Sequence, residues 1–271
     1  MKTTALGLAV LTTAAIVNAQ NVPTTGLTGL WRFQNSAAPL TATIGNNMTT
    51  SDPGNSAPFI GPWTVINPGL SDNGIVQETA WNYLTVNPNF HANGGGDYVN
   101  KYTVMIDYIQ TSGVGSSWNS LFQTAADGHA NDGDLWIAPD GTMGSGDIGY
   151  SSSGINAGTW HRIAWSVDNG NFFRIYVDGS LLLDGAGQSV DGRYSLYPDV
   201  FNLFADNDWE DQWGLVGTVA TWDHALTTDE IAGMGGWLNG SPDPTALTIP
   251  EPSTLALVAL GGLVIARRSR K

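Results

Sequence analysis

The sequence contains no cysteine and few basic residues. The absence of cysteine excludes disulfide bonds, thiolate nucleophiles, iron–sulfur clusters and zinc sites with cysteine ligands. Only 10 Lys and Arg stand against 24 Asp and Glu in 271 residues, which gives a formal net charge of −14. A surface that binds nucleic acid needs clustered basic side chains, so this balance argues against a nucleic-acid partner.

Helical patterns are also scarce. No segment sustains a hydrophobic period of about 3.6 residues, and no motif recurs at a fixed spacing. A disordered chain is excluded, because 42% of the residues are hydrophobic and 11 are Trp. The 34 glycines, the low charged fraction of 13% and the many aromatic residues favour short strands joined by tight turns.

The first 19 residues have the organisation of a secretory signal peptide. Lys2 supplies a positive charge, residues 5–17 form an apolar run, and Ala19 offers a small residue for cleavage. We therefore predict export, with removal of residues 1–19 by signal peptidase.

Three features follow one another at the C-terminus: Pro250-Glu251-Pro252, an apolar stretch over 255–266, and a basic tail over 267–271. This order resembles the PEP-CTERM sorting signal, here assigned to residues 250–271. The resemblance implies a Gram-negative bacterium and processing by an exosortase near Pro250, Glu251 and Pro252. It also implies a location at the cell surface or in the extracellular matrix.

The apolar stretch 255–266 is predicted to be a short transmembrane helix. It is short for a relaxed span, which needs about 20 residues, and the basic tail would stay cytoplasmic. A plain C-terminal membrane anchor is the alternative, and it would also leave the domain outside the cell. Membrane contact is expected only through this segment.

Between the two signals we expect one domain over residues 20–240 and a linker over 241–249. Residues 20–249 hold five basic and 23 acidic residues, a net charge of −18, and 20 of the acidic residues are Asp. Asp favours turns and the ligation of hard cations. The acidity is therefore expected mainly in loops.

The domain shows strand patterns of alternating β-branched and aromatic residues. They cover residues 98–109, 160–168, 172–177, 181–183, 201–204 and 215–222. Asn169-Gly170 predicts a hairpin turn, and Thr227 with Glu230 forms a capping box before a helical segment over 231–237. Many short strands and one short helix predict an antiparallel β-sandwich.

Three of these segments resemble laminin-G-like domains. They are residues 158–168 (GTWHRIAWSVD), 172–179 (FFRIYVDG) and 217–231 (GTVATWDHALTTDEI). The resemblance implies an all-β, antiparallel jelly-roll sandwich of the concanavalin A-like lectin/glucanase superfamily over about residues 20–238. Residues 26–33 are expected to form an edge strand beside the C-terminal strand.

That superfamily holds lectins, glucanases, polysaccharide lyases and adhesion modules, so the fold does not decide the function. Its glucanases carry a Glu-x-Asp-x-(x)-Glu pattern, because glycoside hydrolysis needs paired carboxylates. Glu78 and Glu230 have no carboxylate two or four positions on, and adjacent Glu210 and Asp211 would face opposite sides of a strand. The sequence therefore argues against an enzyme without excluding one, and it assigns no catalytic residue.

One acidic loop is a candidate calcium site. Residues 206–211 (DNDWED) bring together Asp206, Asp208, Glu210 and Asp211. Calcium takes about six to eight oxygen ligands, and neighbouring carboxylates repel unless a cation intervenes. Residues 127–134 form a second acidic loop, and solvated turns are the alternative interpretation of both.

The same loop is flanked by aromatic residues that could form a sugar platform. Sugar rings stack on indole faces while polar side chains bind the hydroxyls. The predicted ligand-binding residues are Trp209, Trp213, Asp206 and Asp208, with Trp118 and Trp136 as the next candidates.

Together these features predict an exported binding module for an extracellular polysaccharide or glycoprotein, with calcium as a candidate cofactor. A hydrolase or lyase of the same fold that acts on polysaccharide is the first alternative. A structural or adhesion protein of the matrix is the second.

Overall fold

The computed structural model describes residues 22–33, 35, 37–50, 76–78, 82–124, 132–197, 200–206 and 210–237. In these ranges the chain forms short strands and one helix, in the following order. The elements are β1 (Leu27–Trp31), β2 (Thr49–Thr50), β3 (Val76–Glu78), β4 (Leu84–Val86), β5 (Lys101–Gln110), β6 (Asn119–Gln123), β7 (Asp134–Ile137), β8 (Met143–Ser145), β9 (Gly149–Tyr150), β10 (His161–Asp168), β11 (Phe172–Val177), β12 (Ser180–Ala186), β13 (Phe201–Leu203), β14 (Gly214–Trp222) and α1 (Thr228–Met234).

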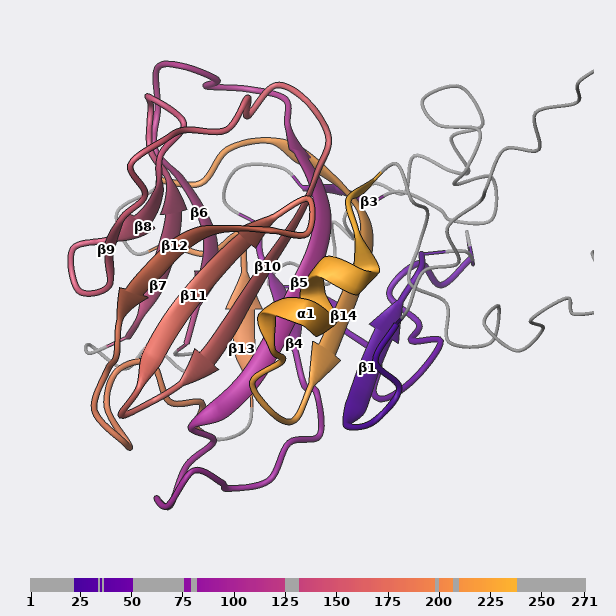
Figure 1. Cartoon of the computed structure of the whole chain (residues 1–271). Coiled ribbons are helices and arrows are strands. Elements are labelled where there is room, and N and C mark those ends of the chain that lie inside the picture. The colour runs from indigo at the N-terminus through magenta and orange to yellow at the C-terminus, as the bar shows by residue number, and fades with distance from the viewer. Residues whose placement is uncertain are drawn as a thin grey trace, which may run out of the picture.

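The strands form two antiparallel sheets packed face to face (Figure 1). The first sheet has the order β1-β14-β5-β10-β11-β12, and β3 also pairs with β14. The second sheet has the order β2-β4-β13-β6-β7-β8-β9. Figure 1 shows the first sheet in front, with α1 lying over it, and the second sheet behind. The predicted jelly-roll sandwich with one short helix is confirmed.

The space between the sheets is filled by large apolar side chains. Trp165 of the first sheet lies with its ring 5.2 Å from that of Phe122 in the second sheet, and Phe122 lies 5.4 Å from Phe201. All three are fully buried. Because side chains alternate along a strand, the strand neighbours of Trp165 and Phe201 point away from the core. That alternation creates the two outer faces of the sandwich.

The outer face of the first sheet is covered by α1. Ile231 and Met234 are buried in a second apolar cluster that includes Met105 and Trp222. The predicted capping box is present at Thr227, which accepts a hydrogen bond from the Glu230 amide at 3.3 Å and donates its own amide to Glu230 Oε2 at 2.8 Å.

Element ends differ from the sequence prediction by up to three residues, and two of these differences have a clear cause. The helix ends at Met234 rather than at residue 237, because Gly235 takes a positive φ of 63°. The strand predicted from residue 98 begins only at Lys101, because the amides of Asp97 and Tyr98 donate to the Asp191 carboxylate at 2.8 and 3.0 Å.

Two further expectations concern the ends of the chain. The edge strand expected over 26–33 is present as β1, which pairs with β14 through Leu30 and Ala220. None of the helices in the described ranges is long and apolar enough to span a membrane. The signal peptide and the segment 255–266 lie outside those ranges.

Candidate functional site

Four polar residues form one row across the outer face of the second sheet. Thr85 of β4 pairs with Asn202 of β13, Asn202 pairs with Gln123 of β6, and Gln123 pairs with Asp134 of β7. Residues opposite one another in a sheet project to the same side. Their chain neighbours belong to the core between the sheets, namely Leu84, Val86, Phe201, Leu203, Phe122 and Leu135. The row therefore faces away from the core.

Burial along this polar row leaves some hydrogen-bonding atoms without partners. Thr85 Oγ1 donates to Asn202 Oδ1 at 2.9 Å. Gln123 is only 5% exposed, and its Nε2 has no hydrogen-bond partner. Asp134 Oδ1 is also buried without a well-aligned partner, although hydrogen bonding from the Gln123 side chain to this carboxyl lowers the pKa of Asp134. Buried polar atoms are nearly always paired in proteins, so these two call for an explanation.

The carboxyl of Asp134 lies in an acidic environment. Its pKa is raised to about 7, first by burial and then by the negative charges of Asp132 and Asp206, while Arg193 lowers it. The structure thus places Asp132 and Asp134, from the acidic loop 127–134, near Asp206 of the loop 206–211, which the sequence analysis treated separately.

Hydrogen bonds from Ser120 of β6 to backbone carbonyls hold the loop before β14 against that strand. Ser120 donates its amide to the Glu210 carbonyl at 2.7 Å and its hydroxyl to the Ala205 carbonyl at 2.5 Å. Asp206 Oδ2 accepts the Glu210 amide at 2.9 Å. Glu210 and Asp211 lie before β14 and outside any strand, in the acidic loop to which the sequence analysis assigned them.

The predicted calcium ligands are only partly visible in this arrangement. Asp206, Glu210 and Asp211 lie in the described ranges, and Asp208 lies outside them. Among the residues that the structure describes, no group of three acidic or His side chains is arranged to hold a metal ion. Calcium binding therefore stays a prediction.

An aromatic group lies beside the polar row. Trp136, two residues after Asp134, pairs with Gly144 of β8, and Gly144 pairs with Tyr150 of β9. Gly144 leaves bare backbone between the two aromatic side chains, whose strands lie about 10 Å apart. Trp118 packs edge-on against Tyr150 with ring centroids 5.8 Å apart.

Two further features connect this aromatic group with the acidic loop. The Nε1 of Trp136 is buried without a hydrogen-bond partner. Burial and the negative charge of Glu210 raise the pKa of Tyr150. We call the surface formed by the polar row, Asp132, Asp206, Glu210 and the aromatic residues Trp118, Trp136 and Tyr150 the outer polar face.

The structure describes only one of the two Trp residues predicted to form the sugar platform. Trp213 is 47% exposed, and its backbone pairs with Thr111 and Ser112 rather than with the outer polar face. Trp209 lies outside the described ranges. Trp118 and Trp136, the next candidates, both lie on the outer polar face.

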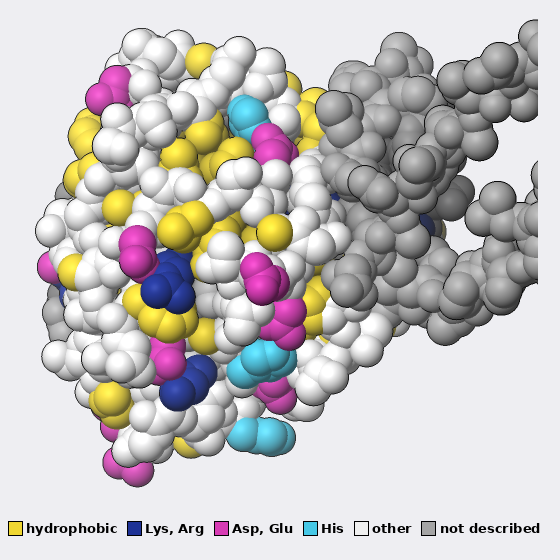
Figure 2. All heavy atoms as spheres, viewed as in Figure 1, with side chains coloured by type: hydrophobic (Ala, Val, Ile, Leu, Met, Phe, Trp, Pro, Cys, Tyr) yellow, Lys and Arg dark blue, Asp and Glu magenta, His cyan; other side chains and the backbone are white. Residues whose placement is uncertain are grey.

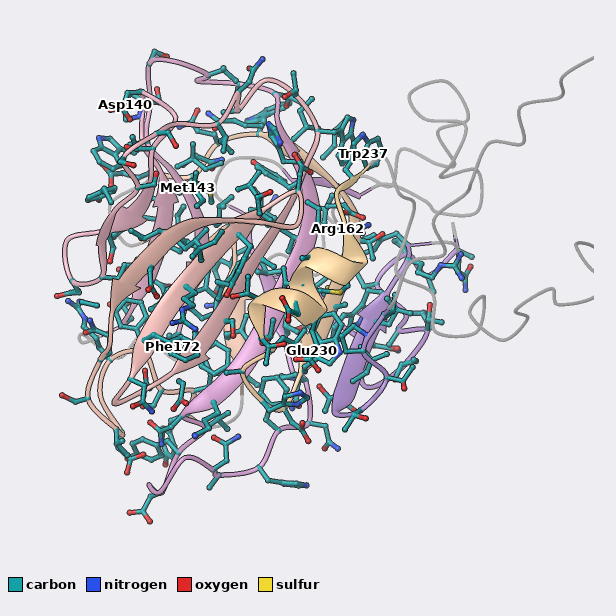
Figure 3. All side chains as sticks on the ribbon, viewed as in Figure 1. Asp140, Met143, Arg162, Phe172, Glu230 and Trp237 are labelled. Atoms are coloured by element: carbon teal, nitrogen blue, oxygen red, sulfur yellow. The ribbon has the colours of Figure 1, made fainter. Side chains whose placement is uncertain are left out.

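A cleft of about 590 Å³ lies elsewhere, where strands β5, β10 and β11 of the first sheet begin or end. The rings of Trp160 and Trp237 stack there at 4.4 Å, and Figure 3 shows Trp237 just beyond α1. The Asp178 carboxylate in this cleft is already engaged, because Oδ2 lies 2.7 Å from His161 Nδ1 and Oδ1 accepts the Arg162 amide at 3.0 Å. We interpret these contacts as structural.

The sequence analysis missed Thr85, Gln123, Asn202 and Tyr150. A signal was present, because Leu84-Thr85-Val86 and Phe201-Asn202-Leu203 each place one polar residue between two apolar ones. Such triplets are typical of strands with one face in the core. They do not reveal which triplets become neighbours in the sheet.

Comparison with known protein families agrees with the observed fold. The profile of the concanavalin A-like lectin/glucanases superfamily matches residues 79–232, more than half of the chain. The chain belongs to this superfamily. Residues 248–271 of this concanavalin A-like protein match the PEP-CTERM protein-sorting motif, which indicates export and sorting to the cell envelope of a Gram-negative bacterium.

Solved structures share the fold of this concanavalin A-like protein at low identity. Domain 4 of AbnA, an extracellular GH43 arabinanase from Geobacillus stearothermophilus solved with arabinotriose, is 17% identical, with a TM-score of 0.53 over 77% of this chain and 98% of that one. A Trypanosoma rangeli sialidase in complex with sialic acid is 15% identical, with a TM-score of 0.52 over 79% of this chain and 33% of that one. A search of curated protein sequences finds no match.

Proposed function

We propose that this chain is an exported carbohydrate-binding protein and that the outer polar face is its binding surface. The observation that carries the proposal is the polar row of Thr85, Asn202, Gln123 and Asp134 beside the aromatic group. Sugar recognition needs both parts, since C–H groups stack on aromatic rings while amides and carboxylates bind the hydroxyls. The arabinotriose complex of the similar AbnA domain supports the ligand class.

The unpaired atoms of this face support binding over a purely structural role. Gln123 Nε2 and Trp136 Nε1 can donate, and Asp134 Oδ1 can accept. A buried donor or acceptor without a partner costs about 1–3 kcal/mol. A hydroxyl-bearing ligand removes this cost, because each hydroxyl both donates and accepts.

The test is a binding screen of the purified full-length protein against soluble polysaccharides. The neutral set is dextran, hydroxyethyl cellulose, arabinan, galactomannan and xylan. The anionic set is alginate, polygalacturonate, dextran sulfate and carboxymethyl cellulose. We expect the wild type to bind at least one polymer, and Trp136→Ala to weaken that binding about tenfold or more through the loss of stacking.

Trp213→Ala is the matched control, because it removes an exposed indole whose backbone pairs with Thr111 and Ser112 rather than with the outer polar face. Its binding should stay within about twofold of wild type. If Trp213→Ala abolishes binding and Trp136→Ala does not, the surface is wrongly placed. If no polymer binds, with or without calcium, the proposed function is wrong and the adhesion alternative is favoured.

One observation favours a second candidate, a polysaccharide hydrolase. A carboxyl whose pKa is raised to about 7 beside other carboxylates has the acidity of a general acid, and Asp134 meets this description. The release of reducing ends from any polymer of the screen, lost in Asp134→Asn, would support this candidate. Binding without turnover would support the binding protein.

A further inference from the structure

The charged side chains of the outer polar face are mostly acidic. The negative charges of Asp132 and Asp206 both act on Asp134, and that of Glu210 acts on Tyr150. Arg193 is the basic group that acts on Asp134. It also forms an ion pair with Asp147 and donates from Nε to the Asp132 carbonyl at 2.7 Å. Much of its charge is therefore balanced before a ligand arrives.

Among the residues that the structure describes, four other side chains are basic, and most of them have acidic partners within the first sheet. Three are paired within the first sheet: Lys101 with Asp168 at 3.2 Å, Arg162 with Asp107 at 2.8 Å, and Arg174 with Asp184 at 2.6 Å. On the helix-covered side, the clearly visible Lys and Arg side chains likewise lie beside acidic ones (Figure 2). A polyanion approaching the outer polar face would thus meet carboxylates rather than free cations.

The unpaired atoms specify the complementary chemistry. Donors at Gln123 Nε2 and Trp136 Nε1 stand on the same face as an acceptor at Asp134 Oδ1. A hydroxyl can accept from a donor and donate to the carboxylate, whereas a ligand carboxylate or sulfate can only accept. Neighbouring hydroxyls on an uncharged sugar ring can both donate and accept, so they match this mixed set of atoms whether or not Asp134 is protonated. A ligand carboxylate or sulfate would instead meet the negative charges of Asp132 and Asp206 beside Asp134.

We propose that the outer polar face selects uncharged, hydroxyl-rich polysaccharide and rejects polyanionic polysaccharide. This inference rests on the proposed function and narrows its ligand class. The negative charge of the face repels polyanionic polysaccharide, whereas the aromatic group binds any sugar ring.

The experiment compares each neutral polymer bound in the screen with its own carboxymethylated and sulfated derivatives by affinity electrophoresis. At low ionic strength the wild type should bind the neutral polymer about tenfold or more tightly than either derivative. In about 1 M NaCl, where the Debye length falls to about 3 Å, the difference should narrow. Added calcium should not make either derivative bind more tightly than the neutral polymer.

Two double variants with the same change in net charge locate the effect. Asp206→Asn/Glu210→Gln should lower the ratio of neutral to anionic affinity several-fold. Asp184→Asn/Asp229→Asn removes two carboxylates from β12 and α1 of the helix-covered side and should leave the ratio unchanged. Equal shifts in both variants would mean that overall charge, not this face, sets the selectivity.

The outcomes separate the two proposals. Binding that depends on Trp136 but is as tight or tighter for the derivatives, or for the anionic set alone, overturns the charge selection and leaves the proposed function standing. No binding to any polymer overturns both.

Discussion

Arg162 and Asp107 form a buried ion pair beneath the helix. Arg162 donates from Nε to Asp107 Oδ1 at 2.8 Å and from Nη2 to Oδ2 at 3.0 Å, and the two side chains are only 2% and 0% exposed. Nη1 also donates to the Met234 carbonyl at 2.9 Å, at the end of α1 (Figure 3). The pair therefore joins β5 and β10 to the helix that covers them.

Removing the cation of this pair should destabilise the fold. Arg162→Met leaves the Asp107 carboxylate buried without its partner, and we expect the free energy of unfolding to fall by about 3–5 kcal/mol in urea denaturation. The double variant Asp107→Asn/Arg162→Met should recover part of that loss, because no buried charge remains. A single-variant loss below about 1 kcal/mol would contradict this role.

Asp134 predicts an unusual dependence of stability on pH. Its pKa is about 7 in the folded protein against an ordinary value of 3.8 for an aspartate, so the folded state binds the extra proton between these two pH values. Stability therefore falls as pH rises from about 4 to 7. Asp134→Asn should remove this fall and stabilise the protein at pH 8, by at most about 4 kcal/mol, with little effect near pH 4. Thermal unfolding across pH measures it.

Asp140 is a control, because its pKa is shifted in the opposite direction to that of Asp134. Hydrogen bonds from the Thr142 hydroxyl and amide lower the pKa of Asp140, so its contribution is lost as pH falls. Asp140→Asn should thus give no gain in stability at pH 8. If both variants behave alike, the effect of Asp134 is one of net charge rather than of its surroundings.

Calcium binding by the loop 206–211 has its own test. If the loop holds a cation, a chelator should lower the melting temperature of the wild type, and Asp208→Ala should abolish that dependence. Asp184→Ala, which removes a carboxylate from β12, should keep the response. A wild-type protein that does not respond to chelator holds no stabilising calcium in this loop.

The sorting motif predicts processing outside the cytoplasm. In the native host, mass spectrometry of the exported protein should find a chain that begins after Ala19 and ends near Pro250-Glu251-Pro252. Glu251→Ala should retain the C-terminal segment and hold the protein at the membrane. An exported wild-type chain that still ends at Lys271 would contradict exosortase cleavage.

The sequence was sufficient for the fold class because several of its strand and helix signals are local. The alternation over 160–168 puts Ile163, Trp165 and Val167 into the core, and the capping box at Thr227 begins the helix. Turn residues such as Gly170, with a φ of 94°, fix the hairpin between β10 and β11.

The candidate site could not be predicted in the same way, because it depends on sheet register. Thr85, Gln123, Asp134 and Asn202 are far apart in the sequence and become neighbours only when β4, β13, β6 and β7 pair. The sequence analysis favoured the local cluster 206–211 instead. That loop contributes Asp206 and Glu210, while its partners come from strands that carry no motif.

Backbone amide hydrogen exchange, with and without a bound neutral oligosaccharide, tests the central claim most directly. The account predicts slower exchange on binding in β6, β7 and the residues before β14, with no change in α1 or around the cleft of Trp160 and Trp237. Protection confined to that cleft, with exchange in β6 and β7 unaltered, would contradict it.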